Sequence, residues 1–257
     1  MHDVGCPEWF NEKAKELTDF TERVEGLRHA FLDRYSPEKL AKMNGTALLR
    51  DVFGDNDAMI QMLMFDSDYR GFGAAGKYKY LGIVYYSDGD GTWRYKEGNR
   101  AISISKEEAE AKAEYIRDKL LECISIIGRS ELNAISDYDK LDDALSHIFF
   151  YKYPWVIKYF QMVYPQYFPG MYADVTLERA LEILGLPDHG KSKRLVNCGE
   201  IALFIRRCNI NNIVFGHIYG TYWGWESVQH ACPSASRNYD ERFIVPKEIN
   251  LRFYKFA

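Results

Sequence analysis

A tight turn between two aromatic segments constrains the fold of this chain more than any other feature of its sequence. Residues 87–91 read SDGDG, and they separate the apolar and aromatic segments 78–86 and 92–95. Because Asp-Gly pairs tolerate the positive φ angles of hairpin turns, the pattern predicts two antiparallel strands. Alternating aspartates also begin a calcium loop, but the glutamate that closes such a loop is missing here. We therefore expect a hairpin and no metal site at this turn.

A capped helix follows the predicted hairpin. Ser105 is a good N-cap, and Glu108 stands at the position that completes a capping box. The residues after it have the spacing of an amphipathic helix, which Gly128 is expected to end. The apolar positions of this helix are Ala109, Ala113, Ile116, Leu120, Ile124 and Ile127.

Helices are also predicted before the hairpin. Apolar spacing predicts one over Glu8–Tyr35, and Ser36-Pro37-Glu38 is a typical helix start. A short third helix is expected over Leu48–Phe53. The apolar run Met59–Phe65 fits either a strand or a buried helix, because its length suits both.

The second half of the chain is mainly helical in its pattern, and the polar stretch 130–137 (SELNAISD) suits a boundary. The sequence therefore predicts an α+β fold. In 1–132 we expect a recognition module with a small curved antiparallel sheet and flanking helices, and in 133–257 a mainly helical module with a C-terminal strand. The elements expected there are helices near 138–149, 154–163, 176–184 and 201–208, a strand or loop at 213–225, and a strand at 243–256.

Composition limits the classes of function. Hydrophobic residues make up 47% of the chain, charged residues 27%, and no apolar run reaches the roughly 18 residues of a membrane helix, so we expect no membrane contact. The net charge of −4 argues against a general DNA coat, which needs a basic surface, but it allows a local patch that reads a base. The five cysteines form no C-x-x-C pair and the N-terminal residues show no signal-peptide pattern. These features predict a reduced, cytoplasmic protein.

Catalytic and metal-binding patterns are weak. His230 and Cys232 stand close together, but no second ligand pair has zinc spacing. The G-x-S-x-G and H-E-x-x-H patterns of hydrolases do not occur. We therefore expect no metal, no cofactor and no catalytic residues.

One glycine-rich segment matches the phosphate-loop pattern G-x-x-x-x-G-K-[ST]. It is 185–192, GLPDHGKS. A true phosphate loop follows a buried strand, whereas the preceding residues have helical spacing, with Thr176 as the expected N-cap and Gly185 as the expected C-cap. No apolar run ending in aspartate follows as a magnesium-binding partner. Nucleotide hydrolysis is disfavoured, but a nucleotide-binding enzyme that uses this loop stays an alternative.

A second segment, 71–76 (GFGAAG), matches the dinucleotide-binding pattern G-x-G-x-x-G. Such a site needs a helix next, but the following residues have the pattern of a strand. The segment is either a flexible loop between strands or a loop whose bare backbone approaches a ligand. Both interpretations stay open.

Basic and aromatic residues interleave around the hairpin. Since side chains alternate along a strand, one face should meet the core and the other could contact phosphate and stack on a base. The alternative is a solvated hairpin face without a ligand. The candidate nucleic-acid-binding residues are Arg70, Lys77, Tyr78, Lys79, Tyr80, Trp93, Arg94, Tyr95 and Arg100.

Spacing and residue type in the first half give a family resemblance. The matching segments are Phe31–Tyr35 with the following SPEKL, Gly45 with Leu48-Leu49, the run MLMF, Arg70-Gly71-Phe72-Gly73, the hairpin end DGTWRY, and SKEEA from Ser105 with Arg117-Asp118. With the second-half segments KYPWVIKYFQMVYPQYFPGMY, LERALEILGL and GEIALFIRR, the chain resembles the N-terminal region of McrB-like proteins, the AAA+ GTPase subunits of modification-dependent restriction systems. The resemblance implies a specificity module that binds DNA, including DNA with a modified base. The motor signatures of that family are absent from this sequence.

The favoured hypothesis is a non-catalytic recognition module of a restriction-type antiviral defence system. Its first rival is an interaction module that contacts a partner ATPase or nuclease and never touches DNA. The second is the nucleotide-binding enzyme. A positive, aromatic concavity would favour DNA, and an apolar patch would favour a protein partner.

Overall fold

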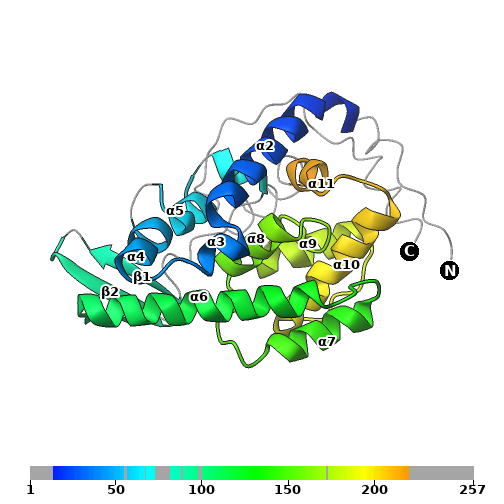
Figure 1. Cartoon of the computed structure of the whole chain (residues 1–257). Coiled ribbons are helices and arrows are strands. Elements are labelled where there is room, and N and C mark those ends of the chain that lie inside the picture. Colours follow the sequence, from blue (N-terminus) through cyan, green and yellow to red (C-terminus); the bar gives the residue numbers. More distant parts are fainter. Residues whose placement is uncertain are drawn as a thin grey trace.

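The computed structural model describes residues 14–54, 57–66, 68–72, 82–87, 89–97, 100–171 and 173–219 (Figure 1). Over these residues the fold is α+β, with helices around a three-stranded antiparallel sheet. The sheet lies at one end of the molecule, and the long helix α6 runs from beneath it toward the helical end (Figure 1). The predicted fold class is confirmed.

The hairpin forms where the turn predicted it. Strands β1 (Ile83–Ser87) and β2 (Thr92–Glu97) pair antiparallel, and the amide of Gly91 donates to the Ser87 carbonyl over 2.8 Å. Gly91 has a φ of +66°, a conformation that favours glycine. A third strand, β3 (Arg100–Ile104), extends the sheet in the order β1-β2-β3 and was not predicted.

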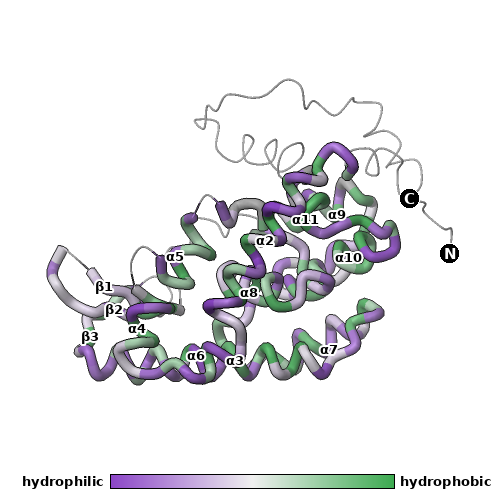
Figure 2. Tube along the Cα trace, turned by 45° about the horizontal axis from the view of Figure 1, so that its top comes forward, coloured by the Kyte–Doolittle hydropathy of each residue, from purple (hydrophilic) through white to green (hydrophobic). Residues whose placement is uncertain are grey.

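The capping box of α6 (Lys106–Gly128) is also confirmed. The Glu108 amide donates to Ser105 Oγ over 3.1 Å, and the Ser105 amide donates to Glu108 Oε2 over 2.7 Å. The predicted apolar positions are buried, and the alternation of hydrophobic and hydrophilic positions along α6 is visible in Figure 2. Helix α4 (Gly45–Phe53) is tied to α6 by the Gly45 amide, which donates to Glu114 Oε1 over 3.0 Å.

The remaining N-terminal elements are short apart from one helix. They are α2 (Thr18–Tyr35), α3 (Pro37–Leu40), α5 (Met59–Met64) and the 3₁₀ helix η1 (Asp68–Phe72). The run from Met59 is therefore a buried helix, which settles the strand-or-helix alternative. The part of the first predicted helix before residue 14, and the predicted strand residues 78–81, lie outside the described residues.

The second half is helical. Its elements are α7 (Ile135–Leu145), α8 (Pro154–Val163), α9 (Asp174–Leu184), the 3₁₀ helix η2 (Lys191–Lys193), α10 (Arg194–Arg207) and α11 (Asn212–Ile218). The predicted C-terminal strand lies outside the described residues.

One element of the helical half differs in type from the sequence prediction. Residues 213–218 are helical rather than strand or loop. Asn211 Oδ1 accepts hydrogen bonds from the Ile213 and Val214 amides, and this N-cap starts α11.

Two helix boundaries also differ. Helix α7 ends at Leu145, so Phe149 lies beyond it and is exposed. Thr176 is inside α9 rather than at its cap, and its hydroxyl donates to the Ala173 carbonyl over 2.7 Å. Phe149 is thus outside the helix in which it was predicted, and Thr176 is not the predicted N-cap.

Two clusters of buried side chains form the core. The larger one joins residues on both sides of the predicted boundary at 132, including Phe31, Ile116 and Trp155. The smaller one is built by α9, α10 and α11, with Leu181 and Phe215 among its members. The division into modules 1–132 and 133–257 stays a prediction, although packing between the two parts is extensive.

Helix α8 anchors elements from the first half through polar groups inside the core. The Tyr159 hydroxyl donates to the Tyr35 carbonyl over 2.8 Å, and Tyr159 is completely buried. This hydrogen bond joins the middle of α8 to the last residue of α2.

We predict that Tyr159→Phe lowers the free energy of unfolding by about 1 kcal/mol, because the buried Tyr35 carbonyl would have no donor in its place. Urea denaturation measures this change. The control is Tyr115→Phe, whose ring is exposed on α6 and whose substitution should leave the midpoint unchanged. Equal midpoints for both variants would contradict the prediction.

Candidate nucleic-acid interface

The structure describes only some of the candidate residues. Lys77, Tyr78, Lys79 and Tyr80 lie outside the described residues, and Arg70 belongs to η1 without a described side chain. Trp93, Arg94 and Tyr95 are consecutive in β2, and Arg100 is the first residue of β3. The described part of the candidate interface therefore consists of β2, β3 and their neighbours.

Strand β2 separates its aromatic side chains from its basic ones. Since neighbouring side chains of a strand point to opposite faces, Trp93 and Tyr95 share one face and Arg94 and Lys96 share the other. Tyr95 is 4% exposed, so its ring belongs to the core rather than to an open surface. The interleaved cluster of the sequence thus does not form one continuous surface along this strand.

One aromatic pair stands near the turn of the hairpin. Tyr86 on β1 is directly opposite Trp93 on β2, and their rings meet edge to face with centroids 5.3 Å apart. Tyr86 is 38% exposed, whereas Trp93 is partly buried and packs against the core. Edge-to-face contact orients both rings. Tyr86, which the sequence analysis did not select, is therefore the ring of this pair most open to a ligand.

Arg94 organises the turn. Its guanidinium pairs with the Asp90 carboxylate, which also accepts a hydrogen bond of 2.8 Å from the Thr92 hydroxyl. The hydrogen bond from Arg94, aided by those from Ser87 and Thr92, holds the pKa of Asp90 well below its usual value. The same pairing raises the pKa of Arg94. The charge of Arg94 is therefore largely offset within the hairpin.

Helix α6 supplies a cation on the aromatic side of the sheet. The Lys112 ammonium lies 4.7 Å from the centroid of the Tyr95 ring, a cation–π contact, and Lys112 is exposed. Lys112 was not among the residues predicted from sequence. Its position three residues after the buried Ala109, at the border of the buried stripe, was the available signal. Arg100 is also exposed at the start of β3.

The segment 185–192 does not have the surroundings of a phosphate loop. Helix α9 precedes it, and Gly185 ends that helix in the left-handed conformation with a φ of 63°, as predicted. The Gly190 amide donates to Asp188 Oδ1 over 2.8 Å, and Asn197 Nδ2 donates to the same oxygen over 2.9 Å. The Asp188 carboxylate therefore already accepts the hydrogen bond of the Gly190 amide. In a phosphate loop such an amide donates to the phosphate of the ligand.

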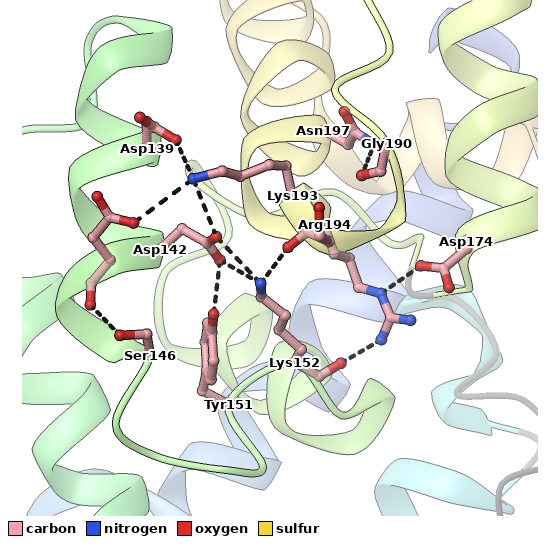
Figure 3. A network of polar contacts seen from close by, with 12 residues as sticks. Asp139, Asp142, Ser146, Tyr151, Lys152, Asp174, Gly190, Lys193, Arg194 and Asn197 are labelled. Atoms are coloured by element: carbon pink, nitrogen blue, oxygen red, sulfur yellow. Dashed lines mark hydrogen bonds and ion pairs between the residues drawn. The ribbon is translucent and has the colours of Figure 1, made fainter.

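Carboxylates also surround the cations near this loop (Figure 3). Lys193 Nζ lies 2.6 Å from Asp139 and 3.9 Å from Asp142, and Arg194 donates to Asp174 over 2.7 Å. Lys191 Nζ is 3.8 Å from Glu178. Because a phosphate would be repelled by these carboxylates, the network is suited to joining α7, α9 and α10 rather than to holding a nucleotide.

The buried thiols are poor nucleophiles. Burial raises the pKa of Cys123 and of Cys198 to about 12, so both are protonated at neutral pH. Among the described residues no group of histidine, cysteine and acidic side chains could hold a metal ion. His230 and Cys232 lie outside them. Within the part of the chain that the structure describes, no helix is both long enough and apolar enough to span a bilayer.

Comparison with known protein families, curated proteins and solved structures finds no match for this chain. The resemblance to McrB-like N-terminal regions therefore stays a prediction that depends on the sequence segments alone.

The buried end of the carboxylate network should contribute to stability. Asp142 accepts a hydrogen bond of 3.1 Å from the Tyr151 hydroxyl and lies 3.1 Å from Lys152 Nζ, with a side chain 6% exposed. We predict that Asp142→Asn lowers the free energy of unfolding by about 1–3 kcal/mol. The asparagine NH₂ would replace one of the two carboxylate oxygens that accept from Tyr151 and Lys152, and a donor would then face a donor. Thermal or urea denaturation measures the change.

The matched control is the neighbouring carboxylate on the solvent side of α7. Asp143 has a side chain 76% exposed and only a distant pairing with Lys193, at 3.7 Å. Asp143→Asn should change stability by less than about 0.5 kcal/mol. A decrease that is the same for both variants would show that the network does not stabilise the fold.

The geometry of the 185–192 loop leads to a prediction about activity. Purified protein with magnesium and ATP or GTP should show no turnover, and Lys191→Ala should change neither this result nor the thermal midpoint, since the Lys191 side chain is largely exposed. A phosphate-release assay checks the first point. Specific turnover that disappears in Lys191→Ala would overturn it.

Proposed function

We propose that this chain is a non-catalytic recognition module of a restriction-type antiviral defence system, and that it binds DNA, including DNA with a modified base, through the surface around the β1–β2 hairpin. The observation that carries the proposal is the Tyr86–Trp93 pair near the turn of this hairpin. The resemblance of the first half to McrB-like N-terminal regions supports the same class of ligand.

The charge of the chain suits a module that relies on stacking. With a net charge of −4, the protein as a whole repels the phosphate backbone, so attraction must come from a few local cations. Arg100 on β3 and Lys112 on α6 are exposed on elements that adjoin the aromatic face. Stacking on an aromatic side chain contributes about 1–3 kcal/mol per base and does not require a basic protein.

The absence of catalysis is part of the proposal. The loop that resembles a nucleotide site is bonded to its own Asp188, and two buried cysteines are held as thiols. Such groups are suited to structural roles. Cys123, Cys198 and Cys208 are free thiols, which fits a reducing cytoplasm, where a DNA-directed defence module would act.

A protein-binding module is the second candidate, and one observation favours it. Ile102 is 46% exposed on β3, which is one of the two outer strands of the described sheet. An outer strand can accept a strand of another protein through main-chain hydrogen bonds, and an exposed isoleucine adds apolar contact. A partner ATPase or nuclease subunit would fit this mode.

The proposal predicts modest DNA affinity that depends on stacking and on local charge. Tyr86→Ala and Trp93→Ala should each weaken binding by about 1–3 kcal/mol and reduce any preference for methylated over plain duplex. Tyr115→Ala, which removes an exposed ring from α6, is the control and should bind normally. Fluorescence anisotropy with methylated and unmethylated duplexes measures the three variants and the unmodified chain.

Salt dependence separates the contribution of charge from that of stacking. Replacing Lys112, Lys77 or Lys79 with glutamine should weaken binding equally for both duplexes and lower the salt slope by about 1 for each phosphate that the side chain no longer neutralises. Titrations at two salt concentrations give this slope. If the unmodified chain binds neither duplex at low salt, the DNA proposal fails and the protein-binding module is favoured.

A further inference from the structure

A cavity of about 240 Å³ lies at the helical end of the molecule, away from the sheet. Its walls come from α2, α8, α10, α11 and the end of η1, and α2, α10 and α11 gather on the side opposite the strands in Figure 1. Ala202 and Ile213 on its wall belong to the larger core cluster, and Ile205 belongs to the smaller one. The cavity thus lies where the two clusters meet.

Two polar atoms on this wall are buried without a partner among the described residues. They are Arg206 Nε, a donor, and Asn212 Oδ1, an acceptor. Buried polar atoms are almost always paired, so an unpaired donor and an unpaired acceptor at one cavity point to a ligand that would pair with them. The remaining wall is mostly apolar, with Phe72, Ile205 and Ile213 among its residues.

The orientation of both side chains is fixed by other contacts. Asn212 Nδ2 donates to the carbonyls of Pro165 and Phe168 over 2.6 Å and 2.5 Å, so the amide cannot turn its oxygen toward them. The Arg206 guanidinium lies 5.5 Å from the Tyr167 ring centroid and donates through Nη2 to the Leu132 carbonyl. The two unpaired atoms are therefore held in place before any ligand arrives.

The charged side chains on the cavity wall indicate which charged group a ligand would carry. Of the two arginines on the wall, Arg28 is paired with Glu25 over 2.7 Å, whereas Arg206 has no carboxylate partner in the described ranges. One guanidinium is therefore uncompensated, and a carboxylate is its best complement. Asn212 Oδ1 then requires a hydroxyl or amino donor from the same molecule.

Size limits the ligand further. An apolar cavity of about 150 Å³ holds benzene, so 240 Å³ suits a molecule somewhat larger than that and smaller than a typical drug. We propose that this cavity binds a small organic carboxylate that carries a hydroxyl or amino group and an apolar body. The site is separate from the hairpin surface and does not depend on the proposed DNA function.

The test uses the full chain and four probes of matched shape. Leucine and leucic acid carry the carboxylate, the donor and the apolar body. Isocaproate lacks the donor, and leucinamide lacks the carboxylate. Isothermal titration at neutral pH should show saturable binding of leucine or leucic acid, with isocaproate and leucinamide each weaker by about tenfold or more, since isocaproate has no donor for Asn212 Oδ1 and leucinamide offers Arg206 a neutral carbonyl in place of a carboxylate.

Variants assign the binding to the cavity. Arg206→Gln should weaken the best probe by about tenfold to a hundredfold, because it removes a charge-assisted hydrogen bond. Arg207→Gln, on the exposed neighbour in the same helix, is the matched control and should bind normally. Gln166→Trp places bulk at an exposed residue of the rim and should abolish binding while circular dichroism and the thermal midpoint stay unchanged.

Three results would overturn the proposal. The first is no binding of any of the four probes at millimolar concentration, which would mean that water alone pairs the two polar atoms. The second is equal binding of leucine and leucinamide, which would exclude recognition of the carboxylate. The third is binding that survives Gln166→Trp in the folded protein, which would place the ligand elsewhere.

Discussion

Burial of α8 on all sides is the constraint on which the rest of the structure depends. Every residue from Trp155 to Met162 is buried, including Lys158 and Gln161. A helix that is enclosed in this way must satisfy its polar side chains inside the core. Lys158 Nζ donates to the Tyr69 carbonyl over 2.9 Å, and the Tyr159 hydroxyl donates to the Tyr35 carbonyl. These bonds fix η1 and the end of α2, so the helical half holds the first half in position.

The candidate interface illustrates how strand geometry redistributes a cluster of side chains. In sequence, basic and aromatic residues alternate along β2, which predicted one face toward the core and one face open to a ligand. In the sheet the same alternation sends Trp93 and Tyr95 to one face and Arg94 to the other, and Asp90 then pairs with Arg94. The cation beside the aromatic face comes instead from Lys112 of α6. The aromatic face and its neighbouring cation thus come from different elements that tertiary packing brings together.

The cavity at the helical end lies at the seam between the two core clusters. Ala202 and Ile213 of the larger cluster and Ile205 of the smaller one line it. Arg206 and Asn212 stand at this seam with one polar atom each unpaired among the described residues. Both are anchored by bonds to distant carbonyls, those of Leu132, Pro165 and Phe168. A preformed polar site with an apolar wall is the arrangement in which binding a small ligand costs little ordering of the protein.

Sequence by itself determined the features whose partners lie within a few residues. The hairpin at Gly91, the capping box of Ser105 and Glu108, and the C-cap at Gly185 all follow from local hydrogen bonds and from glycine's tolerance of positive φ. Tertiary structure alone decided that Tyr95 is buried, that β3 joins the sheet, and that Tyr86 is the exposed ring of its pair. Burial of a side chain depends on packing between residues far apart in the chain, as for Lys158 with Tyr69, and no local pattern encodes which distant surface a side chain will meet.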